Sequence, residues 1–510
     1  MKNKYFYLLI LFLIFFSVSQ IYLKSNITLG WDEGRHANAG HIWYDYYKTL
    51  LAGDFKSYET FLNEYEQKGY NVKWYGVFDP PFHGMWIGFL FLFFGDSITI
   101  ARLSILIFSL LGGYWLFLLS KKILKKDYLS LSVVILYMLS PLVWEYSNEV
   151  ILEPAIAAFF IGWFYFTFYR KKSKLDYLWA GLFLTFAVLM KYHVLIFASL
   201  FMLIYLGYLF LKNYKTFKKY LIIYSLQCIG YMIIAGHWMY YSLIKNNVWE
   251  RMLYEGTGHQ IQSWLFYFQD LQFITYGMIF FLIFLHLVWK KVNKRILMLV
   301  IITLIAGTLI IKNQQTRYLM FYVPFLYILI VQGIYAASKG FKERFKWGRL
   351  KNRFVFLMFM ILIVIISVGY CYKDTVEKKI NLNGYQDYEL LEYMKGVPEP
   401  KLLINFKVPA EYNGYYYNPD QFIFLTMMAN KEHNPLYMQQ YSYYLDLKGV
   451  DDPSLAVYSL EDFPGNKVVV IFKYEREGYE GMIDKIEPLL ENLDYTKKEL
   501  KWWYVYEKIN

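Results

Sequence analysis

The stretches "YFYLLILFLIFFSVSQIYL" (residues 5–23) and "TLGWDEGRHANAG" (residues 28–40) together decide the fold. The first is an unbroken apolar run, long enough to cross a bilayer as a helix. The second places two adjacent acids, Asp32 and Glu33, with Arg35 and His36 directly after that crossing. Because ionisable side chains near a membrane are costly, we take these residues as functional candidates.

The composition indicates a polytopic membrane protein. Of the 510 residues, 57% are hydrophobic and 18% are charged, whereas about 25% are charged in soluble proteins. The N-terminus has the basic start of a signal peptide, but its apolar run continues to Leu23, so we expect a retained first helix. Apolar runs predict about eleven transmembrane helices. They lie at residues 5–23, 98–119, 128–144, 151–169, 177–190, 193–211, 220–243, 269–289, 296–311, 317–338 and 354–372.

The net charge of +12 is carried by short basic loops between these runs. With the N-terminus in the cytoplasm, every such loop falls on the cytoplasmic side, as the positive-inside rule requires. This distribution argues against nucleic-acid binding and favours contact with anionic membrane lipids. Cys228 and Cys371 have no metal-ligand spacing and imply no disulfide framework. The basic loops are "KKILKK" (121–126), "RKKSK" (170–174), "KNYKTFKK" (212–219), "KKVNKR" (290–295) and "KGFKERFKWGRLKNR" (339–353).

The same count of crossings defines the outer segments and two domains. A first loop covers about 24–97, and its apolar segment 82–95 is too short to span, so we expect a partly immersed helix there. A membrane domain over 1–372 is then followed by an extracytoplasmic α/β domain over 373–510. The tail contains three predicted strands, "KLLINF", "KVVVIF" and "WWYVYE", and one predicted helix, "GMIDKIEPLLENL".

Charged side chains from distant stretches gather at the outer membrane face in this topology. A carboxylate there can accept a proton from an attacking hydroxyl, and cations can stabilise the charge that develops on a phosphate leaving group. Arginine binds phosphate as a fork and lysine as a point charge. These residues are Asp32, Glu33, Arg35, Arg102, Glu153, Lys191, His193, His259, Lys312 and Arg317.

Five motifs in order carry a family resemblance over about residues 5–340. The chain resembles membrane-embedded glycosyltransferases of the GT-C fold, in the bacterial group of family 39 related to protein O-mannosyltransferases and the aminoarabinose transferases of lipid A. The motifs are "WDEGRHANAG", "DPPFHGMWIGFLFLFFGDSITIARLSILIFSLLGG", "SPLVWEYSNEVILEPAIAAFF", "GLFLTFAVLMKYHVL" and "KNQQTRYLMFYVPFLYIL".

The resemblance implies inverting transfer of a sugar from a polyprenyl-phosphate donor to a hydroxyl on a lipid, protein or glycan at the outer face of the cytoplasmic membrane. Asp32 matches the general base, and Glu33 would shape that site. Arg102, Lys191 and Arg317 are expected to bind the donor phosphate. Related enzymes often place Lys where this chain has Asp79. The residues expected to line the substrate cavity are Arg35, Asp79, His83, Glu153, His259 and Tyr318.

Other interpretations of these residues stay open. Asp32 could simply be solvated at the membrane interface. Arg102 and Arg317 could anchor helix ends at the membrane surface. Glu153 could complement the dipole of its helix in the first turn. We expect no cofactor or metal, although a divalent ion at Asp32 or Glu33 is an alternative. A lipid-linked sugar flippase is the rival function, but it favours midplane charges and repeat symmetry. A membrane scaffold presenting the tail is a third alternative, which leaves the acids unexplained.

Overall fold

The computed structural model describes most of the membrane region and parts of the tail. The described residues are 4–24, 31–67, 80–170, 173–247, 293–310, 316–344, 352–382, 401–404, 436–437, 468–472, 487–488, 491, 494–499 and 503–508. The chain forms two compact units. The helical unit comprises Met1–Ser25, Asp79–Phe82 and Arg102–Glu377, and the mixed unit comprises Asn26–Phe78, His83–Ala101 and Lys378–Asn510.

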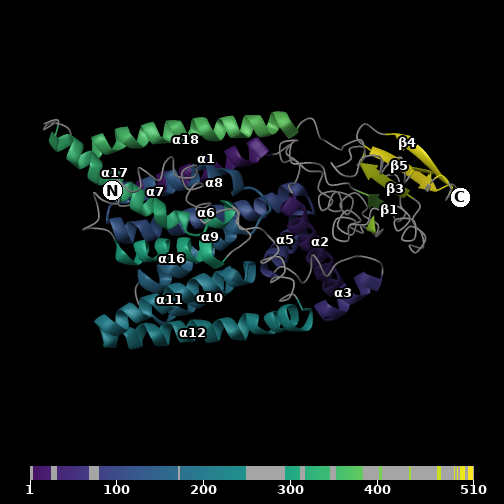
Figure 1. Cartoon of the computed structure of the whole chain (residues 1–510), viewed down its shortest axis with the longest axis horizontal. Helices are drawn as coiled ribbons and strands as arrows, with labels where there is room; N and C mark the ends of the chain where they lie inside the picture. The colour runs from purple at the N-terminus through teal and green to yellow at the C-terminus, as the bar shows by residue number, and fades with distance from the viewer. Residues whose placement is uncertain are drawn as a thin grey trace. The chain divides into compact units, whose positions relative to one another are not determined.

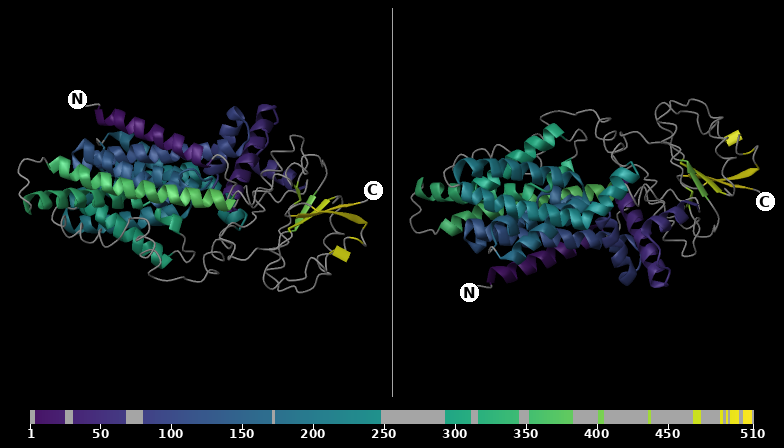
Figure 2. Two further views of the ribbon diagram at one scale, coloured as in Figure 1. Left: turned by 90° about the horizontal axis from the view of Figure 1, so that it is seen from above. Right: turned by 90° about the horizontal axis from the view of Figure 1, so that it is seen from below.

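The helical unit is a bundle of long apolar helices that run side by side (Figures 1 and 2). Within the described residues, six helices are long and apolar enough to cross a membrane, and four shorter helices are also apolar. The bundle contains α1 (Lys4–Lys24), α6 (Ile98–Leu124), α7 (Asp127–Met138), α8 (Pro141–Tyr146), α9 (Glu153–Phe168), α10 (Lys174–Met190), α11 (His193–Lys212), α12 (Tyr214–Met239), the π-helix η1 (Tyr240–Lys245), α16 (Lys294–Ile310), the 3-10 helix η3 (Thr316–Leu319), α17 (Val323–Arg344) and α18 (Asn352–Leu382).

Helix α9 forms the interior of this unit, and every one of its 16 residues is buried. Gly162 lets α10 approach so closely that a Cβ atom there would overlap the Phe183 ring. Gln227 makes two hydrogen bonds within the apolar interior: Trp163 Nε1 donates to Gln227 Oε1 at 3.0 Å, and Gln227 Nε2 donates to Thr167 Oγ1 at 3.3 Å. Gln227 therefore ties α12 to α9 where unpaired polar groups would be costly.

Helices α1, α12 and α18 instead expose many large apolar side chains. Helices α12 and α18 lie along opposite edges of the helical unit (Figure 1). Exposed apolar surface of this extent would aggregate in water and marks a surface that contacts lipid.

Several helix boundaries differ from the sequence prediction. The helix predicted over 317–338 begins only at Val323 as α17, because Thr316–Leu319 form the separate 3-10 helix η3. The run predicted over 128–144 breaks into α7 and α8 because Ser140, which precedes Pro141, takes an extended conformation. Helix α10 begins three residues earlier than predicted because Ser173 and Asp176 form a capping box. The predicted helix 269–289 lies outside the described residues. Helix α18 runs to Leu382, and the domain boundary at 372 stays a prediction.

Three helices within the predicted first loop belong to the mixed unit: α2 (Trp31–Leu51), α3 (Tyr58–Gln67) and α5 (Phe82–Phe94). Helices α2 and α5 meet at glycines. A Cβ atom on Gly88 would lie 2.8 Å from Gly40 O and 2.7 Å from Tyr44 N, so only glycine allows this approach. The short segment 82–95 is indeed helical, but the helix α2 that packs on it was not predicted.

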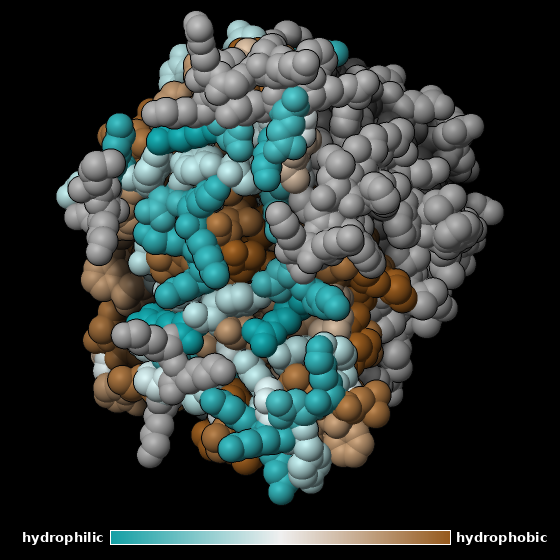
Figure 3. Space-filling model, turned by 90° about the vertical axis from the view of Figure 1, so that its left-hand side faces the viewer, coloured by the Kyte–Doolittle hydropathy of each residue, from teal (hydrophilic) through white to brown (hydrophobic). Residues whose placement is uncertain are grey.

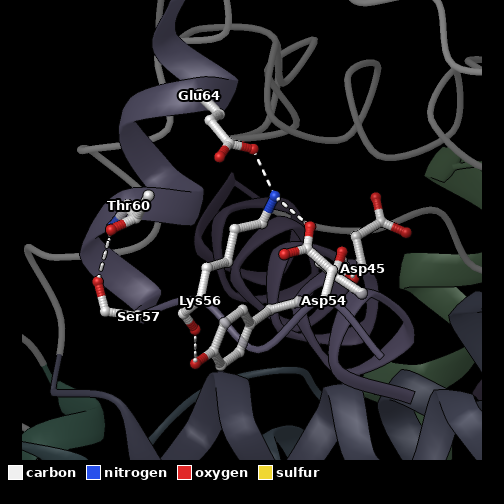
Figure 4. Close-up of polar contacts among 8 residues, drawn as sticks. Asp45, Asp54, Lys56, Ser57, Thr60 and Glu64 are labelled. Atoms are coloured by element: carbon white, nitrogen blue, oxygen red, sulfur yellow. Dashed lines mark hydrogen bonds and ion pairs between the residues drawn. The ribbon is translucent and has the colours of Figure 1, made fainter. Parts of the chain in front are cut away.

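The turn from α2 to α3 is held by Lys56 (Figure 4). Its ammonium lies 2.8 Å from Asp54 Oδ2 and 2.5 Å from Glu64 Oε2, while Tyr46 donates to its carbonyl oxygen at 3.0 Å. The Trp43 and Tyr58 rings stack at 4.0 Å beneath this turn and join α3 to α2. These contacts make an ordered helical hairpin from a segment that the sequence indicated only as a loop.

The described part of the tail forms a five-stranded sheet in the order β2-β1-β3-β5-β4. Strands β2, β1 and β3 are parallel, whereas β5 is antiparallel to both β3 and β4. Their bounds are β1 (Lys401–Ile404), β2 (Leu436–Tyr437), β3 (Val468–Phe472), β4 (Tyr495–Glu499) and β5 (Trp503–Lys508). The three predicted strands correspond to β1, β3 and β5. The helix predicted over 481–493 lies largely outside the described residues.

Candidate active site

The candidate site of the helical unit begins at the N-terminus of α9. Glu153 is the first residue of this helix and precedes Pro154, which suits the first turn because its missing N–H needs no partner there. A carboxylate at this position complements the helix dipole. Glu153 is nevertheless only 4% exposed, so it also requires cationic partners.

Lys191 supplies the first partner from the junction of α10 and α11. Its backbone is extended at the C-terminal cap of α10, and its N–H donates to the Ala187 carbonyl. Its Nζ donates to Glu153 Oε1 at 3.0 Å. The break between α10 and α11 thus places Lys191 next to Glu153 of α9.

Arg317 supplies the second partner from η3. Its Nε lies 3.8 Å from the same Glu153 Oε1. The next residue, Tyr318, places its ring 4.1 Å from Lys191 Nζ and 5.7 Å from Arg317 Cζ, within the range of cation–π attraction. We call Glu153, Lys191, Arg317 and Tyr318 the α9 cluster.

The α9 cluster carries one more positive than negative charge. Burial alone lowers the pKa of Lys191, but the negative charge of Glu153 and the neighbouring Tyr318 outweigh this effect and raise it. Lys191 therefore stays protonated at neutral pH. A buried carboxylate that holds two cations side by side produces a net positive site in a medium of low dielectric, which is the electrostatic requirement for binding a phosphate.

His193 extends the aromatic wall of this cluster. It begins α11, and its ring centre lies 5.9 Å from that of Tyr318 and 6.4 Å from that of Phe321. Arg102, the other predicted phosphate ligand, is 4% exposed and is the fifth residue of α6.

The predicted acids and histidine of the first loop belong to the mixed unit. Asp32 and Glu33 lie in the first turn of α2; Glu33 is 5% exposed, and the Asp32 side chain is outside the described part. His83, 1% exposed, packs edge-on against His36 with ring centres 5.0 Å apart. Arg35 lies on the same helix, two residues after Glu33. Asp79 and His259 lie outside the described residues.

The ion pairs of His41 in the mixed unit were not predicted. His41 Nε2 lies 3.4 Å from Asp45 Oδ2, and His41 Nδ1 lies 3.5 Å from Asp96 Oδ2. Burial lowers the pKa of His41, but hydrogen bonds and charge from Asp45 and Asp96 dominate and raise it to about 9. The cationic imidazole thereby joins α2 to Asp96, which lies two residues after the end of α5. The i, i+4 spacing of His41 and Asp45 in the sequence could have indicated their contact. Nothing in the sequence indicates the contact between His41 and Asp96.

No three His, Cys, Asp or Glu residues within the described ranges gather as a metal site. The expectation of a reaction without a metal stays a prediction, since the Asp32 side chain is not among those described.

Comparison with known proteins places the fold. No protein-family model and no curated protein matches the sequence. Among solved structures, ArnT from Cupriavidus metallidurans in the apo state is similar over 98% of both chains, with a TM-score of 0.66 and 13% identity. The same protein bound to undecaprenyl phosphate is similar over 100% of this chain and 99% of its own. The TM-score is again 0.66 and the identity 13%.

A second solved protein is similar over most of this chain. The oligosaccharyltransferase AglB from Archaeoglobus fulgidus, in complex with an inhibitory peptide and a dolichol-phosphate, covers 99% of this chain and 74% of its own. The TM-score is 0.53 and the identity is 12%. ArnT and AglB both have the GT-C fold. The chain is therefore a multi-pass membrane protein with the GT-C fold, as the motifs predicted.

Proposed function

We propose that this protein is a glycosyltransferase that moves a sugar from a polyprenyl-phosphate donor to a hydroxyl acceptor. The α9 cluster carries the proposal, because its net positive charge suits the phosphate of such a donor. The GT-C fold supports it: ArnT has been solved with undecaprenyl phosphate and AglB with a dolichol-phosphate. The acceptor is a hydroxyl on a lipid, protein or glycan at the outer face of the cytoplasmic membrane.

The reaction needs one base and a stabilised leaving group. Asp32 accepts the proton of the acceptor hydroxyl, and the oxygen forms a bond to the anomeric carbon from the face opposite the phosphate. The bond from that carbon to the phosphate oxygen breaks, and the electron pair leaves with the polyprenyl phosphate. Lys191 and Arg317, with Arg102, stabilise the added negative charge. The configuration at the anomeric carbon is inverted.

The other predicted residues support these steps. Glu33 shapes the base site, and Glu153 holds Lys191 and Arg317 in place. Tyr318 supplies an aromatic wall, and Arg35, Asp79, His83 and His259 line the sugar and acceptor cavity. The reaction uses no nucleotide and no metal, and the N-terminus lies in the cytoplasm.

The test is mass spectrometry of envelope lipids, glycans and proteins from cells with and without the gene. We expect one sugar modification to disappear without the gene and to return with the wild-type chain but not with Asp32→Asn. Asp494→Asn, an exposed acid of the same unit that is far from α2 in the sequence, is the matched control and should restore the modification.

Two outcomes would contradict the proposal. An unchanged envelope in cells that lack the gene removes the transferase function. Full complementation by Asp32→Asn removes the assigned base. Movement of a lipid-linked sugar across vesicle membranes by the purified protein, without formation of a glycosidic bond, would favour the flippase.

A further inference from the structure

A pocket of about 530 Å³ opens where α11 ends and where α12 and α16 begin, all within the helical unit. The end of the helical unit at which α12 begins presents mainly hydrophilic side chains among hydrophobic ones (Figure 3). The pocket is lined by Tyr205, Tyr208, Leu209, Lys212, Asn213, Thr216, Asn293, Lys294 and Arg295.

This pocket is separate from the α9 cluster. His193, the first residue of α11, is next to that cluster, whereas Lys212, the last residue of α11, lines the pocket. A straight helix of this length spans about 30 Å. The two sites therefore lie at opposite ends of one membrane-spanning helix.

The lining is rich in positive charge. It contains Lys212, Lys294 and Arg295, and none of the described residues that line it is acidic. Two helices also begin here: the Asn213 side chain caps α12 by accepting from Thr216 N at 3.0 Å, and the Asn293 side chain accepts from Arg295 N at 3.2 Å. Helix N-termini add partial positive charge to the three cations.

Arg295 is held in position by aromatic rings. Its Cζ lies 5.5 Å from the ring centre of Tyr205 and 5.7 Å from that of Phe168. On the facing side, Lys212 Nζ donates to Tyr208 Oη at 2.9 Å. Arg295 is thus positioned before any ligand arrives, which reduces the entropy lost on binding.

We propose that this pocket binds a phosphate group, with Arg295 as the planar fork and Lys212 and Lys294 as point charges. The basic loops assign this end of the bundle to the cytoplasmic side. Two kinds of molecule at that side could supply the phosphate group: an anionic phospholipid, through its head group, and soluble inorganic phosphate. Tyr205, Tyr208 and Leu209 give the pocket an apolar wall. This wall suits the part of a phospholipid where the head group joins the acyl chains.

The experiment measures how the purified, detergent-solubilised chain retains phosphatidylglycerol in native mass spectrometry. The variant is Lys212→Gln/Lys294→Gln, since both lysines are exposed and Arg295 with its aromatic contacts remains. The matched control is Lys215→Gln/Lys218→Gln, which removes two lysines of the first turns of α12 that do not line the pocket. Diacylglycerol, which has no phosphate, is the neutral-lipid arm, and inorganic phosphate is added as the competitor.

We expect the wild type to retain one phosphatidylglycerol molecule that the pocket variant binds about tenfold more weakly, while the control stays within about twofold. Displacement by millimolar inorganic phosphate assigns the pocket to a soluble phosphate; retention despite phosphate assigns it to the lipid. Equal losses in the pocket variant and the control overturn the proposal, as does equal retention of diacylglycerol. Circular dichroism of each variant establishes that it is folded.

Discussion

The Lys191 ammonium lies 3.0 Å from Glu153 Oε1. The two residues come from the C-terminal cap of α10 and the first position of α9, and both are largely withdrawn from solvent. Glu153 also pairs with Arg317, so one carboxylate sets the distance between two cations that would otherwise repel each other. The position of both cations therefore depends on Glu153.

Glu153→Gln is expected to destabilise the helical unit. The substitution keeps the size of the side chain but leaves Lys191 and Arg317 near each other in the interior without their shared counter-charge. Breaking a buried ion pair in this way costs about 3–5 kcal/mol. We expect the apparent Tm in detergent to fall by several degrees. Glu343→Gln, which removes an exposed acid paired with Lys339 at 3.8 Å, should leave it nearly unchanged. Equal Tm values for the two variants would contradict the importance of the buried pair.

Lys191→Met is expected to weaken the binding of undecaprenyl phosphate to the purified protein. A charge-assisted hydrogen bond contributes about 1.5–3 kcal/mol, which corresponds to a loss of affinity of about 10- to 100-fold. The matched control is Lys122→Met, an exposed lysine near the end of α6. Native mass spectrometry with undecaprenyl phosphate measures both. If Lys191→Met binds as tightly as Lys122→Met, the α9 cluster does not hold the phosphate.

Tyr318 should stabilise Lys191 through its ring and not through its hydroxyl. Tyr318→Phe keeps the aromatic face 4.1 Å from the ammonium, whereas Tyr318→Leu removes it. A double-mutant cycle of Tyr318→Leu with Lys191→Met should give a coupling of about 1 kcal/mol in thermal stability. The same cycle with Tyr318→Phe should give a much smaller coupling. Similar couplings for both variants would show that the ring face is not responsible.

The stability of the mixed unit should decrease at alkaline pH because of His41. Its pKa is raised to about 9 in the folded state by Asp45 and Asp96, against about 6.5 in the unfolded chain. A raised pKa means that the stabilisation is fully present below about pH 6.5, declines as the pH rises and is lost above about pH 9. Its full size is on the order of 3 kcal/mol.

His41→Gln tests this pH dependence because it removes the titrating group and keeps a polar side chain. The difference in apparent Tm between the wild type and the variant should be largest near pH 6 and should shrink towards pH 10. A difference that stays constant over this range would show that His41 is not cationic in the folded protein.

The membrane character and the meeting of distant charges could be predicted from the sequence. Glu153 and Arg317 lie at the starts of apolar runs and Lys191 follows the end of one, so the topology predicted from the basic loops places all three at the same membrane face. The structure brings these three together in one cluster. The assignment of Lys191 and Arg317 to the donor phosphate stays a prediction, as do the assignment of Glu153 to the substrate cavity and of Asp32 as the base.

The parts that could not be predicted depend on contacts between distant segments. Helix α2 has no strong apolar pattern. It packs closely on α5 through the small residues Ala39 and Gly40. Strand β4 has the exposed polar sequence "YTKKE" and forms because β5 supplies hydrogen bonds along its length. The Asp96 contact to His41 likewise exists only after α5 has packed on α2.

Gly88→Ala is expected to loosen the packing of α5 on α2. The new methyl group would lie 2.8 Å from Gly40 O and 2.7 Å from Tyr44 N, and both are backbone atoms that cannot turn away. Overpacking of this kind costs about 1–3 kcal/mol. Because Asp96 follows α5 closely, a shift of this helix should also weaken the Asp96–His41 pair, and the pH dependence described above should become shallower.

Gly207→Ala is the matched control for this substitution. Gly207 lies on α11, and no atom lies within 4 Å of the position that a Cβ atom would take there. Alanine therefore adds no clash and gains helix propensity of up to about 1 kcal/mol. Apparent Tm values measured at pH 7 should fall for Gly88→Ala and hold or rise for Gly207→Ala. If Gly88→Ala is as stable as Gly207→Ala and keeps the full pH dependence, α2 and α5 do not meet at Gly40 and Gly88. A loss of stability without any change in the pH profile would instead separate this glycine contact from the His41 ion pair.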